Sequence, residues 1–214
     1  MTEPTRPVRA VIWDFGGVVT SSPFDAFARY EAEAGLPSGF IRQLNARNPD
    51  SNAWALFERS EVDVATFCRL FEAEAAEAGH PLEGERVIAC LAGEIRPRMV
   101  AVLNWLSGRY RLGCITNNVR ADYDAGERRA RIAEVMKLFD VVIESREVGI
   151  RKPEPRIYEI ACERLEVTPA EAVYLDDLGV NLKPARAMGM HTIKVTDPDE
   201  ALAELERALG ATLP

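Results

Sequence analysis

Two periodicities of apolar residues follow one another along this chain and divide it into two kinds of structure. The apolar run 8–13 ends at Asp14 and is followed by Gly16 and Gly17, which predicts a β-strand that leads into a turn. Between residues 24 and 78, apolar residues recur at three- and four-residue spacing, which is typical of amphipathic helices. We therefore expect a helical segment without strands over 19–96, inserted after the first strand.

From residue 97 onward, short apolar runs alternate with helical patterns. The predicted strands are 112–116, 141–143, 173–175 and 192–195, with helices over 100–106, 156–165 and 181–188 and a final helix that carries Leu202, Leu205 and Leu209. Alternation of this kind implies a parallel sheet that helices cover on both faces. The sequence thus predicts an α/β, Rossmann-like core built from 1–18 and 97–214, with 19–96 as a separate helical unit.

Length, composition and charge narrow the class of protein. A chain of 214 residues can bury one substantial core and a smaller unit, and 47% apolar with 28% charged residues is ordinary for a folded protein. The net charge of −8, without a basic stripe, argues against nucleic acid as a partner. Residues 1–9 lack the apolar segment of a signal peptide and no run is long enough for a membrane span, so we expect a cytoplasmic protein with no membrane partner.

The cysteines and histidines do not form a recognisable site. The cysteines are scattered without a CxxC pair, at Cys68, Cys90, Cys114 and Cys162. We expect buried free thiols, as in a reducing compartment. His80 and His191 lie far apart in the sequence, which disfavours both a zinc site of the usual ligand type and a serine–histidine triad.

Four short polar signatures follow or flank apolar runs in a fixed order. They are VIWD ending in Asp14, CITNN with Thr116 and Asn117, GIRKPEP with Lys152, and YLDD with Asp176 and Asp177. Ligands of open parallel sheets bind beyond the carboxyl ends of the strands, so these side chains should meet at one edge. A nucleophilic carboxylate, a hydroxyl, an amide, an ammonium group and two further carboxylates suit a metal-assisted attack on a phosphoryl group.

Each signature alone has a simpler explanation. Asp14 could cap a turn or belong to a nucleotide site, Thr116 and Asn117 could cap a helix, and Lys152 could be a solvated loop lysine. The adjacent carboxylates of YLDD are harder to explain in this way, because they repel each other unless a cation lies nearby.

In their order and spacing, the four segments resemble the haloacid dehalogenase superfamily of hydrolases over nearly the whole chain. The stretch from CITNN through ESREVGIRKPEPRIYEI to YLDDLGVNLKPARAMGMHTI is most similar to the N-terminal phosphatase domain of soluble epoxide hydrolases. The start, AVIWDFGGVVTSSP, is similar to the hydrolase-like domain fused to some acyl-CoA dehydrogenases. The resemblance implies that 19–96 is a cap domain over the active site.

The resemblance also implies a role for each polar residue. Asp14 would attack phosphorus and form an aspartyl-phosphate, while Thr116, Asn117 and Lys152 would bind the phosphate and take part in catalysis. The implied ligands of Mg²⁺ are Asp14, the backbone carbonyl of Gly16, Asp176 and Asp177, with Asn181 orienting the carboxylates. Physical chemistry agrees with the need for a cation, because a carboxylate and a phosphate dianion repel each other.

One position departs from the pattern of the superfamily. Its phosphatases usually carry a second Asp two residues after the nucleophile, which protonates the leaving group and later activates water. Here that residue is Gly16, which keeps the backbone carbonyl but lacks an acid. General acid–base catalysis is worth about 10²–10⁴-fold, so we expect acidic leaving groups such as phenolates to be tolerated better than alkoxides.

Three functions remain open at this point. We favour a Mg²⁺-dependent phosphatase of a small phosphorylated molecule. A metal-independent 2-haloacid dehalogenase would also lack the second Asp, but the paired carboxylates of YLDD argue against it. A catalytically silent binding or regulatory protein would have no need of the full charge set. The sequence does not fix the substrate or the oligomeric state, for which a homodimer is one option.

The aromatic residues of the helical unit have two possible roles. They could line a substrate pocket, but at helical spacing they fit the hydrophobic core of the unit itself better. They are Phe24, Trp54, Phe57, Phe67 and Phe71.

Overall fold

A five-stranded parallel sheet organises the larger part of the molecule. The computed structural model describes residues 7–117 and 126–214. The strands are β1 (Ala10–Trp13), β2 (Arg111–Thr116), β3 (Val141–Glu144), β4 (Ala172–Asp176) and β5 (His191–Lys194). Their order in the sheet is β3-β2-β1-β4-β5, and every pair is parallel. The predicted α/β fold with a parallel sheet is confirmed.

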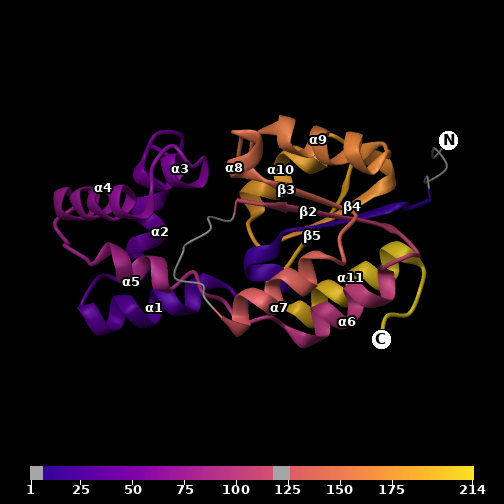
Figure 1. Ribbon diagram of the computed structural model, residues 1–214, viewed down its shortest axis with the longest axis horizontal. Helices are drawn as coiled ribbons and strands as arrows, with labels where there is room; N and C mark the ends of the chain where they lie inside the picture. The colour runs from indigo at the N-terminus through magenta and orange to yellow at the C-terminus, as the bar shows by residue number, and fades with distance from the viewer. Residues whose placement is uncertain (1–6, 118–125) are drawn as a thin grey trace.

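Helices cover the sheet on both faces, as Figure 1 shows. On one face lie α6 (Pro97–Leu106), α7 (Glu127–Met136) and α11 (Pro198–Leu209). The other face carries α8 (Ser145–Val148), α9 (Pro155–Leu165) and α10 (Gly179–Ala187), and the short turn η2 (Pro169–Glu171) precedes β4. This three-layer arrangement is what parallel crossovers produce.

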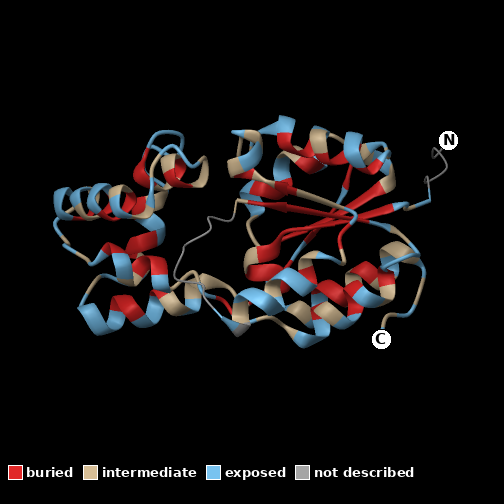
Figure 2. Cartoon of the chain, viewed as in Figure 1, coloured by how far each residue is buried: buried red, intermediate tan, exposed pale blue. Residues whose placement is uncertain are grey.

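The central strand β1 shows why the apolar runs become strands. Val11 and Trp13 point into the hydrophobic cluster beneath α6 and α11, whereas Ala10 and Ile12 point into the cluster beneath α9 and α10. All four residues are fully buried, and the neighbouring strands β2 and β4 are buried along most of their length (Figure 2). Side chains of a strand alternate between its faces, so a strand covered on both sides must be apolar throughout.

A second unit consists of helices only, and we call α1–α5 the cap. Its helices are α1 (Pro23–Ala34), α2 (Phe40–Asn45), α3 (Ala53–Glu58), α4 (Val64–Glu77) and α5 (Gly84–Ala89). They share a hydrophobic cluster of their own, separate from the two clusters that flank the sheet. Phe57, Phe67 and Phe71 are buried in this cluster, and Phe24 and Trp54 pack against it. The aromatic residues therefore form the interior of the cap.

The chain enters and leaves the cap through two adjacent segments. After β1 it passes through the turn η1 (Phe15–Val19), and Thr20 then forms an antiparallel bridge with Ile95. The Arg96 backbone N–H donates to the Val19 carbonyl at 2.9 Å. These crossings lie next to the predicted limits of the helical unit, while the division into two domains itself stays a prediction.

A few elements differ from those predicted. Strand β5 begins and ends one residue before the predicted range 192–195, because the exposed His191 and Lys194 flank only two buried residues and obscure the pattern. Helix α10 begins at Gly179 rather than at Asn181. Helix α5 was not predicted, because a segment of six residues that begins with glycine is too short to show a helical pattern of apolar residues. Among the described residues, no helix is long and apolar enough to cross a membrane.

Candidate active site

Three polar residues of the sequence signatures lie at the carboxyl edge of neighbouring strands. Asp14 follows β1, Thr116 ends β2 and Asp176 ends β4. The Asp14 backbone N–H donates to the Leu175 carbonyl at 2.8 Å, which continues the pairing of β1 with β4. The chain runs outward from β1 to β2 and β3 and then crosses to β4 on the other side. Ligand sites of open α/β sheets form at such a reversal of strand order.

Lys152 brings the carboxylates of β1 and β4 together. Its Nζ lies 2.8 Å from Asp14 Oδ1 and 2.9 Å from Asp176 Oδ2. The side chain comes from the loop between α8 and α9 and is only 2% exposed. Burial disfavours its charge, but the two carboxylates outweigh this effect and raise the pKa of Lys152 above its usual range. The ammonium group is therefore held in its charged form.

Asp176 is fully enclosed by donors. Its Oδ1 accepts from the Leu178 backbone N–H at 2.8 Å and from Asn181 Nδ2 at 3.0 Å. Its Oδ2 accepts from Lys152 and from the hydroxyl of Tyr174. With no exposed surface and donors on both oxygens, Asp176 orients the ammonium group of Lys152.

Asp177 lies against the turn that follows the first strand. An added Cβ on Gly17 would lie 2.3 Å from Asp177 Oδ2, and Gly17 has a φ of +78°. Both facts require glycine there, because a side chain would displace the carboxylate and L-residues avoid this backbone region. At Gly16, by contrast, nothing lies within 4 Å of an added Cβ. An acid at position 16 would have room, so its absence is a property of the sequence and not of crowding.

The three carboxylates form a group that fits a divalent cation. Asp14, Asp176 and Asp177 each offer an oxygen, and these oxygens lie within 4.8 Å of one another. Burial raises the pKa of Asp14 to about 8 although Lys152 lowers it, and burial with the charge of Asp176 raises the pKa of Asp177 to about 6. One ammonium group faces three carboxylates, so a hard cation that prefers oxygen ligands would relieve their repulsion.

Asn117 lies against the backbone of Lys152. Its Nδ2 donates to the Lys152 carbonyl at 3.0 Å, and its Oδ1 accepts from the Lys152 backbone N–H at 2.9 Å. A second, longer contact of 3.4 Å joins Nδ2 to Glu58 Oε2. In the structure this amide fixes the backbone of Lys152, and its predicted contact with the phosphate stays a prediction. An asparagine at a strand end can do either, and only the tertiary structure decides which.

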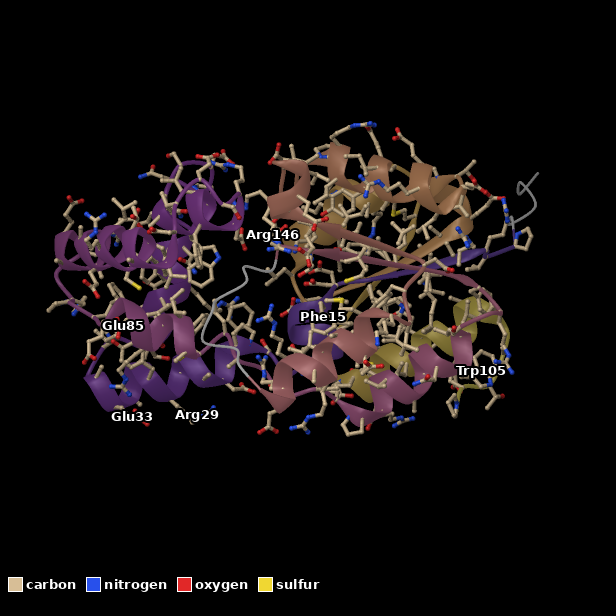
Figure 3. The ribbon with its side chains drawn as sticks, in the orientation of Figure 1. Phe15, Arg29, Glu33, Glu85, Trp105 and Arg146 are labelled. Atoms are coloured by element: carbon tan, nitrogen blue, oxygen red, sulfur yellow. The ribbon has the colours of Figure 1, made fainter. Side chains whose placement is uncertain are left out.

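The remaining predicted residues lie near these groups. Thr116 is buried at the end of β2, and Asn181, also buried, donates to both oxygens of Asp176. The Gly16 backbone lies in the turn after Asp14. In Figure 3, Phe15 of the same turn lies at the end of the core that faces the cap, while Trp105 lies at the opposite end.

Four residues of this region were missed by sequence reasoning. Tyr174 could have been found, since it lies two residues before Asp176 and therefore on the same face of β4. Glu58 and Arg151 pair with each other across the boundary between cap and core, and Arg96 lowers the pKa of Asp177. These three had no signal, because their positions depend on how the cap and its connections rest on the core.

Comparison with known proteins identifies the family. The profile of the haloacid dehalogenase-like hydrolases matches residues 8–189. Acyl-CoA dehydrogenase family member 10 of Mus musculus is 35% identical over 97% of this chain, which covers 20% of that protein. Bifunctional epoxide hydrolase 2 of Sus scrofa is 31% identical over 96% of this chain, which covers 40% of that protein. The chain thus spans less than half the length of these relatives.

Solved structures agree on the fold. A predicted hydrolase of this family from Porphyromonas gingivalis superposes with a TM-score of 0.66 at 20% identity, over 94% of this chain and 99% of that one. A family enzyme from Bacteroides thetaiotaomicron, in complex with magnesium and inorganic phosphate, gives 0.59 at 17% identity over 87% and 93% of the two chains. An L-2-haloacid dehalogenase from Xanthobacter autotrophicus with covalently bound chloropropionic acid gives 0.60 at 17% identity over 97% and 84%. On the strength of the profile match, this chain belongs to the haloacid dehalogenase-like hydrolases.

Proposed function

We propose that this hydrolase is a Mg²⁺-dependent phosphatase that transfers the phosphoryl group of a small monoester to Asp14. The observation that carries the proposal is the charge arrangement at the sheet edge, where three carboxylates lie together and one ammonium group pairs with two of them. A dehalogenase that attacks a neutral carbon without metal has no use for this surplus of negative charge.

The residues of the chain suggest how the first step would proceed. Asp14 Oδ1 accepts from Lys152 Nζ and, at 2.6 Å, from the Phe15 backbone N–H. Two donors on one oxygen orient the carboxylate and leave Oδ2 for in-line attack on phosphorus. The bond from Oδ2 to phosphorus forms while the bond from phosphorus to the ester oxygen breaks. Because Gly16 carries no acid, the departing oxygen takes its proton from water.

The second step restores the enzyme. Water attacks phosphorus, the bond to Asp14 Oδ2 breaks, and inorganic phosphate leaves with Asp14 again a carboxylate. In both steps Lys152 would balance negative charge beside Asp14, and the Thr116 hydroxyl would donate to the phosphoryl group. Asn117 and Asp176 hold Lys152 in position, one through its backbone and the other through its ammonium group.

The proposed ion is Mg²⁺, which would be held by Asp14, Asp177 and the carbonyl of Gly16, with Asp176 supporting them. When bound, it would supply positive charge that lets the carboxylate approach the phosphate. The oxygen donor set fits a hard cation of this kind.

A phosphate-release screen tests the proposal. Purified protein is assayed on aryl, alkyl and acyl phosphates with Mg²⁺ or with EDTA, beside the isosteric variant Asp14→Asn. We expect release that needs Mg²⁺ and is lost in the variant. The same preparations are incubated with 2-chloropropionate in EDTA. Halide release without phosphate release would reject the phosphatase in favour of a dehalogenase, and an inert wild type would favour a binding protein.

A further inference from the structure

The end of cap helix α3 contacts the core at residues 145–152. The Ser145 hydroxyl, which is fully buried, donates to the Glu58 carbonyl at 2.6 Å. The Glu58 carboxylate pairs with the Arg151 guanidinium, and Arg151 Nη1 also donates to the Pro49 carbonyl of the cap at 2.8 Å. These polar contacts all join one end of α3 and the loop before it to the segment that contains Lys152.

This contact reaches the groups that position Lys152. Glu58 Oε2 lies 3.4 Å from Asn117 Nδ2, and Asn117 holds the Lys152 backbone through two hydrogen bonds. Arg151 is the residue directly before Lys152. A movement of α3 away from the core would therefore remove a partner from Asn117 and from Arg151 at the same time.

The Glu58 side chain is largely buried, and both of its carboxylate oxygens have partners. Its side chain is 14% exposed and that of Arg151 is 16% exposed. Glu58 Oε1 accepts from the Trp54 indole N–H at 3.1 Å, so both carboxylate oxygens have partners. Burial raises the pKa of Glu58, while Arg151 and Trp54 lower it. With its oxygens occupied, Glu58 is unsuited to replace the acid that is missing at position 16.

We propose that Glu58 is a positioning residue through which the cap sets the geometry of Asn117 and Lys152. When α3 rests on the core, Glu58 holds Arg151 and Asn117, and these residues hold Lys152 beside Asp14. Closure of the cap and binding of a phosphoryl group then favour each other, because both require the same position of Lys152. The expected effect on kinetics rests on the proposed function. The contacts of Glu58 with Arg151 and Asn117 do not depend on that function.

A double-mutant cycle tests the kinetic consequence. Glu58→Gln, Arg151→Gln and the double variant are compared with wild type on 4-nitrophenyl phosphate and for inhibition by inorganic phosphate. We expect each single variant to lower kcat and weaken phosphate inhibition by about 2- to 30-fold, and the double variant to lose less than the product of the two. The control Glu61→Gln removes the same charge from an exposed pair with Arg59 and should change neither value. Multiplicative losses, or losses in thermal stability alone, would overturn the proposal.

Hydrogen exchange on the ligand-free protein separates this inference from the proposed function. Glu58→Gln should speed exchange in peptides that cover 145–152 at a temperature where all variants are folded, and Glu61→Gln should not. If the wild type releases no phosphate from any substrate, the proposed function fails, and faster exchange in Glu58→Gln alone still supports the positioning role. Unchanged exchange in that segment overturns the role whatever the activity.

Discussion

At the carboxyl edge of the sheet, each charged side chain has several partners, whereas the cap reaches that edge through few polar contacts. Lys152 bridges two carboxylates, and Asp176 accepts from four different residues. The cap contributes Glu58 and the carbonyl of Pro49, and its aromatic side chains fill its own interior. The positions of the charged groups at the sheet edge are therefore fixed by many contacts within the core, whereas the position of the cap relative to that edge depends on few.

This difference suggests that the core fixes the reacting groups and that the cap controls access to them. A charge group that must approach a phosphoryl centre needs fixed positions, and strands buried on both faces provide them. A unit with a separate hydrophobic cluster can change its distance from the core without breaking either interior. We therefore expect substitutions at the sheet edge to alter chemistry, and substitutions inside the cap to alter stability and substrate access.

Lys152→Met should give the largest effect, because it leaves the buried carboxylates of Asp14 and Asp176 without their common partner. We expect activity at assay background and a loss of about 3 kcal/mol in the free energy of unfolding. Urea denaturation and phosphate release measure the two effects. Lys137→Met, which breaks an exposed pair with Glu134, should cost under about 1 kcal/mol and leave activity intact. Equal stability losses in the two variants would mean that Lys152 is not a buried counter-charge.

Phe67→Ala should destabilise the cap and leave the carboxylates that would bind the cation unchanged. Phe67 is fully buried and stacks on Phe57 at 4.5 Å between ring centroids, so we expect a loss of about 3–5 kcal/mol. Binding of Mg²⁺, measured by calorimetry where the variant is folded, should stay within the error of wild type. Leu70→Ala on the exposed side of the same helix should cost about 0.5 kcal/mol or less. Loss of Mg²⁺ binding in Phe67→Ala would show that the cation ligands depend on the packing of the cap.

Gly16→Asp should sharpen the account of the leaving group. The space around Gly16 is open and its φ of −71° suits any residue, so an aspartate can be accommodated beside the nucleophile. We expect kcat/KM for alkyl phosphates to rise by up to about 10²-fold, with little change for 4-nitrophenyl phosphate. Gly16→Asn has the same shape without a transferable proton and should give no such gain. A similar gain in both variants would assign the effect to shape and not to acid catalysis.

Gly17→Ala should weaken the binding of Mg²⁺, in addition to the backbone strain that the φ of +78° imposes on alanine. The added methyl group would meet Asp177 Oδ2 and force the carboxylate to move. We expect the Mg²⁺ concentration for half-maximal activity to rise about 10- to 100-fold. Gly16→Ala, one residue earlier and unobstructed, is the matched control and should leave this concentration nearly unchanged. An unaltered Mg²⁺ requirement in Gly17→Ala would remove Asp177 from the proposed ligand set.

The sheet and its edge could be predicted from sequence because burial on both faces leaves a clear pattern. Buried runs that end at Asp14, Thr116 and Asp176 place those residues on one rim by topology alone. Lys152 lies in a loop, so its role followed only from the family resemblance, and its bridge between Asp14 and Asp176 appears only in the structure.

The sequence could not predict the orientation of individual side chains or the contacts between the cap and the core. The amide of Asn117 can face a ligand or a neighbouring backbone, and no local pattern distinguishes the two. Nothing in the sequence distinguishes Glu58 from an exposed residue at the end of a short helix. In the structure its side chain is largely buried against Arg151. Such contacts depend on how two separately packed units meet, which leaves no periodic signal in either segment.

Chemical trapping of the phosphorylated enzyme identifies the residue that attacks phosphorus. Wild type is mixed with 4-nitrophenyl phosphate and Mg²⁺, quenched during turnover, reduced with borohydride and digested for peptide mass spectrometry. We predict conversion of Asp14 to homoserine, the product of reducing an aspartyl-phosphate, and its absence when EDTA replaces Mg²⁺. An unmodified Asp14 in a sample that is releasing phosphate, or modification of a different residue, would contradict the account.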